Sequence, residues 1–293
     1  MATIGFIGIG TMGAPMAINL LKAGHRIRAF DLNADALTPL LEKGAARARD
    51  AADAADGAEI VITMLPNGEH VEAAIFGDKG VVETLSAESL LIEMSTIAPS
   101  VTDRIGKRLA ARGRAMIDAP VGRSSKHAEE GKLLIMIGGA AADVERARPV
   151  LACLGDLLVH CGPLGAGGRM KIVNNYMSVS LNLLTAETLV LAEAAGLTPE
   201  QARQVMLGTV AGQGHMGTTY PAKVLRGDLT PGFMVDLAHK DLGLALELGA
   251  SLNVPMLTGA VAHEIYGVAR GRGRGRDDWT ALYQVVREMA SLP

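Results

Sequence analysis

Cysteine, aromatic residues and long apolar runs are all scarce in this chain of 293 residues. Only Cys153 and Cys161 occur, too few for a disulfide framework in a chain of this length, so we expect reduced thiols and a cytoplasmic protein. No uncharged apolar segment reaches the roughly 18 residues of a membrane span, and no basic stretch followed by an apolar one opens the chain. Secretion and a membrane partner are therefore not expected.

An excess of charge of either sign is also missing, because 28 Lys and Arg residues stand against 31 Asp and Glu, a formal net charge of −3. This balance gives no reason to expect nucleic acid as a partner. The seven histidines show no spacing typical of metal ligands, so we expect no metal site. The class that remains is a globular protein that acts on a small molecule.

From Thr3 to about Cys161, short apolar runs alternate with amphipathic helical segments. This alternation is typical of a mostly parallel sheet covered by helices. We predict strands at Ile4–Gly8, Arg26–Asp31, Ile60–Met64, Leu90–Met94, Ala115–Asp118, Leu133–Ile137 and Leu157–His160. The predicted fold class is therefore α/β, with a Rossmann-type doubly wound sheet as the N-terminal domain, residues 1–162.

Beyond Gly162 the sequence predicts helices alone. One unbroken helical stretch runs from Gly165 to Gly196 and would be about 45 Å long if straight. Further helices are predicted at Pro199–Met206, Pro231–Leu252, Leu257–Arg270 and Trp279–Met289. Residues 163–293 would form an all-α domain for substrate binding and oligomerisation, with 165–195 as the connecting helix. A helix so long and apolar predicts a homo-oligomer, either a dimer or a tetramer.

A Gly8-Ile9-Gly10-Thr11-Met12-Gly13 run directly follows the first predicted strand and opens a helix. Such a run places a diphosphate at the positive end of the helix, and Asp31, at the end of the second strand, would bind the ribose hydroxyls and repel a 2′-phosphate. The alternative is a cluster of turn glycines with a surface aspartate. We predict NAD as the cofactor, bound by Gly8, Gly10, Thr11, Met12, Gly13 and Asp31.

Two further loops follow strand ends, Met64-Leu65-Pro66-Asn67 and Met94-Ser95-Thr96-Ile97. Ligands of doubly wound sheets lie across the carboxyl ends of the strands, so we predict that Leu65, Pro66 and Thr96 face the cofactor. The alternative is ordinary loop chemistry that caps the next helix.

Five polar residues share one face of the long predicted helix, namely Lys171, Asn174, Asn175, Ser178 and Asn182. A solvated face normally carries several charges, so this stripe predicts a face that lines a cleft between the two domains. There Lys171 would act as general acid or base at a carbonyl oxygen, and the amides would orient the substrate. The alternative is a contact between helices in which the amides supply specificity.

The segment Asp118-Ala119-Pro120-Val121-Gly122-Arg123-Ser124-Ser125 follows another strand. Arg123, beside a glycine and two hydroxyls, makes a group of donors suited to a strong anion, although a surface arginine is the simpler alternative. Lys240, on a C-terminal helix, would reach the cofactor, although a helical lysine is usually solvated. The run Arg270-Gly271-Arg272-Gly273-Arg274-Gly275-Arg276 lacks interleaved aromatics, which favours a basic loop over an RNA contact.

These motifs together resemble the β-hydroxyacid dehydrogenase family along essentially the whole chain. The similarity lies in Gly8–Ala17 as cofactor signature, Asp118–Val121 as the start of the substrate loop, Gly167–Asn175 as catalytic helix and Lys240–Leu244 as cofactor-side segment. The resemblance implies that Lys171 is the catalytic lysine, that Asn175 binds substrate and that Lys240 lies near the nicotinamide.

One departure from the family pattern concerns the substrate. The usual loop reads Val-Ser-Gly-Gly, whereas this chain has Val121-Gly122-Arg123-Ser124. A sulfonate offers three acceptors where a carboxylate offers two, so an added guanidinium favours a sulfonate. The chain is similar to sulfonate-directed members of the family, and the resemblance implies substrate contacts from Gly122, Arg123, Ser124, Asn174, Asn175 and Ser178.

The resulting prediction is reversible, NADH-dependent reduction of a short aldehyde that bears a terminal sulfonate. A carboxylate-directed dehydrogenase stays open as an alternative, because a guanidinium also binds carboxylates. A non-catalytic NAD-binding protein that has kept the fold is the other alternative.

Overall fold

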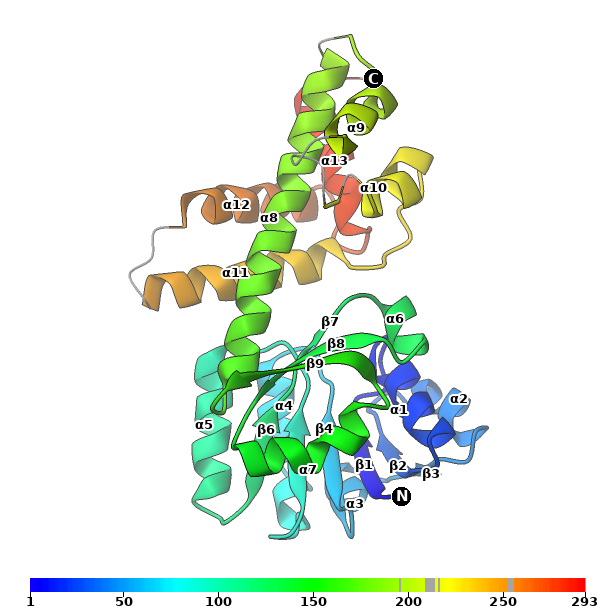
Figure 1. Ribbon diagram of the computed structural model, residues 1–293, viewed down its shortest axis with the longest axis vertical. Coiled ribbons are helices and arrows are strands. Elements are labelled where there is room, and N and C mark those ends of the chain that lie inside the picture. Colours follow the sequence, from blue (N-terminus) through cyan, green and yellow to red (C-terminus); the bar gives the residue numbers. More distant parts are fainter. Residues whose placement is uncertain (195, 209–213, 216, 252–255, 293) are drawn as a thin grey trace. The chain divides into compact units, whose positions relative to one another are not determined.

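The computed structural model describes residues 1–194, 196–208, 214–215, 217–251 and 256–292 (Figure 1). The chain divides into two compact units, Met1–Lys171 and Ile172–Pro293. Each unit has hydrophobic core clusters of its own.

The first unit is built on a nine-stranded sheet. Six of its strands are parallel and follow the order β3-β2-β1-β4-β5-β6, which is the strand order of a Rossmann fold. Their bounds are β1 Thr3–Ile7, β2 Arg26–Phe30, β3 Ala46–Arg47, β4 Ile60–Thr63, β5 Leu90–Glu93 and β6 Ala115–Asp118. The predicted doubly wound sheet is confirmed; the two-residue strand β3 was not predicted because it contains no apolar run.

Strands β8 (Leu133–Gly138) and β9 (Gly155–Gly162) run opposite to the first six strands of the sheet, whereas the short β7 (Val121–Gly122) keeps their direction. Strand β8 is antiparallel to both β6 and β7, and β9 is parallel to β8. Only Asp118 pairs with β8, opposite Gly138. The earlier residues of β8 therefore extend beyond the carboxyl end of β6, and β7 lies alongside that extension.

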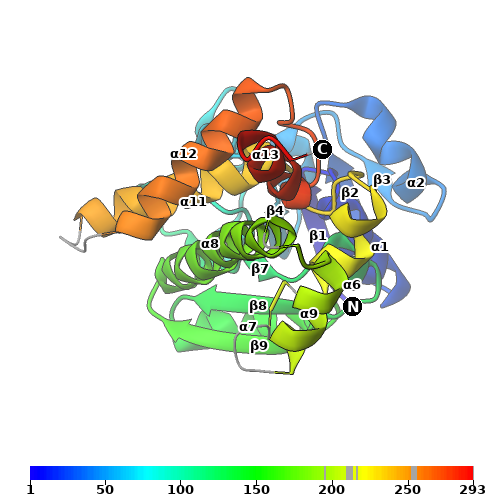
Figure 2. The same ribbon diagram turned by 90° about the horizontal axis from the view of Figure 1, so that it is seen from above.

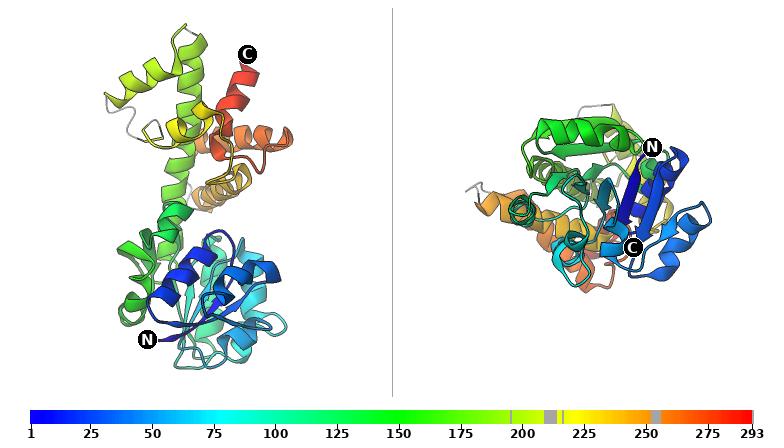
Figure 3. Two further views of the ribbon diagram at one scale, coloured as in Figure 1. Left: turned by 90° about the vertical axis from the view of Figure 1, so that its right-hand side faces the viewer. Right: turned by 90° about the horizontal axis from the view of Figure 1, so that it is seen from below.

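Helices cover both faces of this sheet (Figure 3). One face is packed by α1 (Gly13–Lys22), α2 (Thr38–Leu41) and α7 (Ala141–Leu151), and the other by α3 (Ala51–Ala55), α4 (Gly68–Phe76) and α5 (Pro99–Ala110). Within β4, Ile60 and Ile62 belong to the core cluster under α1, α2 and α7, which we call the first core cluster. Val61 belongs to the cluster under α3, α4 and α5. Burial on both faces explains why the parallel strands appear in the sequence as continuous apolar runs.

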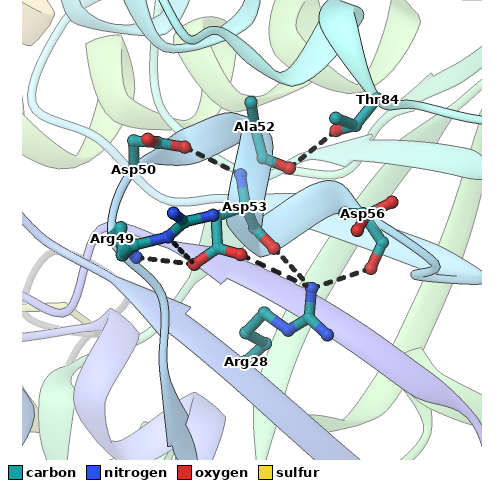
Figure 4. A network of polar contacts seen from close by, with 7 residues as sticks. All are labelled: Arg28, Arg49, Asp50, Ala52, Asp53, Asp56 and Thr84. Carbon is teal, nitrogen blue, oxygen red and sulfur yellow. Dashed lines mark hydrogen bonds and ion pairs between the residues drawn. The ribbon is translucent and has the colours of Figure 1, made fainter.

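The short helix α3 is fixed by a polar network around its carbonyl groups (Figure 4). Asp50 caps its start by accepting the amide of Asp53, and Arg28 donates to the carbonyls of Asp53 and Asp56 at 2.6 and 2.9 Å. Thr84 donates to the carbonyl of Ala52 at 2.6 Å. These bonds satisfy the backbone groups that a helix of one and a half turns leaves without partners.

The second unit is helical. Helix α8 (Ala166–Ala194) begins in the first unit and continues into the second. The other helices are α9 Pro199–Leu207, α10 Thr219–Ala222, α11 Val235–Ser251, α12 Leu257–Gly271 and α13 Leu282–Met289. Helices α11 and α12 lie side by side (Figure 2). Their apolar sides meet α8 around a core that includes Leu183, Tyr220 and Tyr266.

The predicted start of one helix shifts for a local reason. Helix α11 starts at Val235, four residues after the predicted Pro231, because the buried Asp278 accepts the amides of Gly232 and Phe233 and keeps these two residues in a bend outside the helix. Its predicted end, Leu252, lies outside the described residues. In the part of the chain that the structure describes, no helix is long and apolar enough to cross a membrane.

Candidate active site

The loop between β1 and α1 has the geometry of a diphosphate cradle. Gly8 has φ +95°, and a Cβ on it would lie 2.2 Å from the carbonyl oxygen of Met64. A Cβ on Gly13 would lie 2.0 Å from the carbonyl oxygen of Gly8, whereas one on Gly10 would meet nothing within 4 Å. The first and third glycines are thus required by packing, and the second leaves the backbone open to an approaching ligand.

The start of α1 points to the same ligand chemistry. Its N-cap residue, Met12, makes no side-chain capping bond to the first amides of the helix. Thr11 is exposed in the same turn. A helix N-terminus whose amides lack a side-chain cap, behind an open glycine, fits the diphosphate of a dinucleotide.

Asp31 ties the end of β2 to this loop. Its Oδ2 accepts the amide of Ile9 at 2.6 Å and its Oδ1 accepts the amide of Asn33 at 2.8 Å. The carboxylate therefore fixes the glycine-rich loop and stands beside it with lone pairs that ribose hydroxyls can use.

The loops after β4 and β5 are joined to each other. The amide of Leu65 donates to the hydroxyl of the buried Ser95 at 2.9 Å, and the amide of Ser95 donates to the buried Glu93 at 2.7 Å. Pro66 is exposed and Thr96 is half-buried at this edge. The capping alternative holds for Asn67, which accepts the amide of His70 at the start of α4.

The start of α8, which carries Lys171, is anchored by Asp118 at the end of β6. The two oxygens of this carboxylate accept the amides of Gly165 and Gly168, both at 2.6 Å. Burial raises the pKa of Asp118, while the amide bonds from Gly168 and Gly165 act to lower it. A Cβ on Gly167 would lie 2.3 Å from the carbonyl oxygen of Met136, so the helix start also fits closely against β8. Lys171 lies one helical turn beyond these anchored residues.

Asn174, Asn175 and Ser178 lie on α8 beyond Lys171. Asn174 is exposed and donates to the Oδ1 of Asn175 at 3.2 Å, while the buried Asn175 donates to Oδ2 of the buried Asp241 on α11. Lys240 pairs with the other oxygen of Asp241 at 3.0 Å. Asp241 thus links two predicted site residues, and no sequence pattern points to it apart from its place beside Lys240.

The backbone at Ser178 is held by His215, which the sequence analysis treated only as one of seven unremarkable histidines. Its Nε2 lies 2.6 Å from the carbonyl oxygen of Ser178, and its ring meets Trp279 edge to face with centroids 4.8 Å apart. Burial lowers the pKa of His215, and its bond to Ser178 acts to raise it.

The predicted polar stripe is wrong at its last member. Asn182 is fully buried and donates to the hydroxyl of Tyr266 and to the carbonyl of Trp279 at 2.8 and 2.9 Å. It serves the contact between helices that was the alternative interpretation. Because α8 is covered by α12 at this height, a residue eleven positions beyond Lys171 lies in the helical core.

Arg123 follows β7, where Gly122 is buried, and precedes α6 (Ser125–Glu129). Its guanidinium donates to Asp156 and to the carbonyl of Lys132 at 2.6 and 2.5 Å. Ser124 is exposed, and its hydroxyl lies 2.9 Å from Nδ1 of His127. The pairing of Arg123 with Asp156, 33 residues away, was not predicted.

The arginines of the Arg-Gly run are largely paired within the second unit. Arg270 binds Asp236 at 2.7 Å, Arg272 binds Glu288 at 2.6 Å, and Arg274 binds both Glu288 and Asp277. This pairing agrees with a structural loop. Within the described ranges, no cluster of three or more His, Cys, Asp or Glu residues could hold a metal ion.

Comparison with known proteins identifies the family. Residues 3–162 match the NAD binding domain of 6-phosphogluconate dehydrogenase, and residues 165–286 match the NAD-binding domain of NADP-dependent 3-hydroxyisobutyrate dehydrogenase. The chain belongs to the β-hydroxyacid dehydrogenases. It is an oxidoreductase that uses a nicotinamide cofactor, as the resemblance implied, and the glycine loop and the start of α1 fit such a group.

Individual members of the family match over nearly their full length. The chain is 52% identical to 3-sulfolactaldehyde reductase of Escherichia coli K12, with 100% of this chain and 98% of that protein covered. It is 39% identical to 3-hydroxyisobutyrate dehydrogenase of Pseudomonas aeruginosa, with 92% of each covered. The structure of 3-hydroxyisobutyrate dehydrogenase from Mycobacterium tuberculosis with L-serine superimposes with a TM-score of 0.90 at 34% identity, over 98% of this chain and 99% of that one.

Proposed function

We propose that this dehydrogenase catalyses the reversible, NADH-dependent reduction of 3-sulfolactaldehyde to 2,3-dihydroxypropane-1-sulfonate. The observation that carries the proposal is Arg123, placed in the substrate loop where the usual family sequence has glycine, in a chain 52% identical to a 3-sulfolactaldehyde reductase. A guanidinium offers a sulfonate charge-assisted hydrogen-bond donors, and a glycine at this position has no side chain to supply them.

The cofactor form proposed is NAD. Asp31 stands where a ribose 2′-phosphate would bring further negative charge, and residues 31–37 read Asp-Leu-Asn-Ala-Asp-Ala-Leu without a basic side chain. Enzymes that take NADP commonly place an arginine near this position to meet the phosphate. We assign cofactor binding to residues 1–162 and substrate binding to residues 163–293 together with the loop at Arg123.

Lys171 is the proposed catalytic residue. The bound nicotinamide supplies the hydride that adds to the aldehyde carbon. The ammonium group of Lys171 gives a proton to the aldehyde oxygen, which becomes the hydroxyl of the product, and in the reverse direction the neutral amine takes that proton back. Asp118 and Gly167 hold the helix start that carries this lysine.

The proposed substrate residues are those of the loop and of α8. Arg123, with Gly122 and Ser124, binds the sulfonate, while Asn174, Asn175 and Ser178 hold the rest of the small molecule through neutral donors and acceptors. Lys240 is assigned to the nicotinamide end. Its ion pair with Asp241 holds the Lys240 ammonium group beside the carboxylate that accepts from Asn175.

We also propose a homo-oligomer in a reducing compartment. The second unit exposes a strip of large apolar side chains on α8 and α12, where Met177, Leu184 and Val261 are 63%, 56% and 58% exposed. They border a cavity of about 460 Å³ lined mainly by apolar residues. A second copy of the chain would cover this strip. Cys153 and Cys161 are free thiols, in keeping with a cytoplasmic enzyme.

The decisive experiment compares kcat/KM for 3-sulfolactaldehyde, methylmalonate semialdehyde and succinic semialdehyde with NADH. A preference of about 100-fold for the sulfonate, equivalent to about 2.7 kcal/mol in the transition state, is expected. Equal or higher values for the carboxylates would contradict the proposal and assign a carboxylate substrate, for which Arg123 would be a general anion clamp.

A further inference from the structure

The backbone of Arg123 is held in an unusual conformation. Its φ is +75°, one of three positive values among non-glycine residues in the described part of the chain. An L-residue in this region is destabilised by contact between its Cβ and its own backbone, and persists where the surroundings fix it.

Two contacts hold the guanidinium, and both use the same nitrogen. Nη1 donates to the Asp156 carboxylate at 2.6 Å and to the carbonyl of Lys132 at 2.5 Å. Lys132 immediately precedes β8 and Asp156 lies in β9, so the arginine is fastened to two paired strands of the sheet. The side chains of Arg123 and Asp156 are 32% and 50% exposed, so solvent-borne ligands can reach the pair.

The other edge of the guanidinium remains available for a ligand. Nη1 has two N–H groups and both are engaged, whereas Nε and Nη2 carry three more. Nε and Nη2 of Arg123 donate to no other residue in the part of the chain that the structure describes. These two nitrogens form a planar fork that matches two oxygens of one anionic group.

The pair lies on the ligand side of the sheet. Because β8 is antiparallel to β6 and meets it only at Asp118 and Gly138, the start of β8 and the adjoining β7 extend past the carboxyl end of β6. Arg123 directly follows β7. Ligands of doubly wound sheets bind beyond the carboxyl ends of the strands.

We propose that Asp156 is a positioning and specificity residue for anion recognition, which holds Nη1 of Arg123 so that the Nε and Nη2 edge faces the sulfonate of the substrate. The inference rests on the proposed function. A sulfonate is the base of a strong acid and accepts hydrogen bonds more weakly than a carboxylate, so it does not displace Asp156 and takes the remaining edge. Fixing the arginine beforehand removes the entropy cost of ordering it when the substrate binds.

The test is the Asp156→Ala variant, assayed with 3-sulfolactaldehyde and NADH. KM for the aldehyde should rise about tenfold while kcat changes less than about twofold, because in this role the side chain acts on binding of the anion through Arg123 and takes no part in the chemical step. Asp156→Asn keeps one acceptor for Nη1, so its KM should lie between that of the wild type and that of Asp156→Ala. A KM that stays the same or decreases, as it would if Asp156 competed with the substrate, overturns the inference.

Two controls separate this role from a general charge effect. Glu130→Ala removes a carboxylate that pairs with Lys132 in the same region without touching Arg123, and should leave KM within about twofold. In an Arg123→Gly background, Asp156→Ala should no longer change KM, since the residue it positions is gone. Independent effects of the two substitutions would contradict the coupling.

The outcome for the wild type distinguishes the two proposals. A wild-type enzyme that fails to reduce 3-sulfolactaldehyde refutes the proposed function. A wild-type enzyme that reduces it, together with an Asp156→Ala variant of unchanged KM, refutes the positioning role alone.

Discussion

The carboxylate of Asp118 accepts the backbone amide of Gly168 at 2.6 Å, and Lys171 lies three residues further along the same helix. The carboxylate at the end of β6 therefore holds the start of α8 in place. A proton donor must stand within hydrogen-bond reach of the atom it serves, so the orientation of this helix start bears directly on the chemistry.

Asp118→Ala should lower kcat by about 10- to 100-fold, because the amides of Gly165 and Gly168 lose their acceptor and the helix start shifts. The Kd for NADH, which depends on the glycine loop, should change little. Asp103→Ala is the matched control, since it removes an exposed ion pair to Arg169 on the same helix and should cost less than threefold. A normal kcat in a folded Asp118→Ala protein would show that the anchor is dispensable.

Lys171→Ala should reduce kcat by about 10²- to 10⁴-fold, the usual contribution of a positioned general acid. Stopped-flow binding of NADH should remain close to that of the wild type, which would separate a chemical defect from a folding defect. Lys107→Ala, on the outer helix α5, serves as the charge control. Near-normal turnover of Lys171→Ala would refute the assigned mechanism.

Asp31→Asn should raise kcat/KM for NADPH by about tenfold and lower that for NADH, because the amide oxygen can still accept from Ile9 while the repelling charge is removed. Steady-state rates with both cofactors measure the change. Asp35→Asn removes a charge from the same loop, where Asp35 contacts Asn33 through its backbone amide, and should leave the ratio unaltered. If the two variants behave alike, the preference does not depend on Asp31.

His215 should make the stability of the protein depend on pH. Burial lowers its pKa from the ordinary 6.5, so at higher pH both folded and unfolded chains carry it neutral. As the pH falls below about 6.5, the unfolded chain binds a proton before the folded one does, and the free energy of unfolding decreases. His215→Gln, which can still donate to Ser178, should lose part of this dependence.

The measurement is urea unfolding at pH 7.5 and pH 5.5 for both proteins. His25 and His239 also have lowered pKa values through burial, so the difference between wild type and variant is the informative quantity. Equal losses of stability on acidification would show that His215 is not responsible.

The sequence predicted those parts of the structure that depend on local pattern. Buried parallel strands are continuous apolar runs and the glycine loop sits between a strand and a helix, so the family and fold class were predicted and are confirmed. The partners of the site residues lie far away in the sequence. Asp156 meets Arg123 across 33 residues and Asp241 meets Asn175 across 66, and no periodicity encodes such pairs. Asn182 was misassigned because helical spacing shows which residues share a face of α8, but it does not show which part of that face is buried under other helices.

Because β8 runs opposite to the first six strands, the residues proposed to select the coenzyme and the loop proposed to select the substrate's anionic group lie on different parts of the sheet. Apart from Lys240, the groups assigned to the nicotinamide dinucleotide come from loops at the ends of parallel strands β1, β2, β4 and β5, whereas the segment 121–132 begins with β7 and leads into the antiparallel strand β8. This segment meets the cofactor half at α1, where Asn19 donates to the carbonyl of Ala128 at 2.6 Å, and through Val121 and Ala128, which belong to the first core cluster. Exchange of residues 121–132, with position 156 to match, would therefore change which anionic group the enzyme accepts while the glycine loop and Asp31 keep their sequence, so this stretch can vary separately from the coenzyme loops.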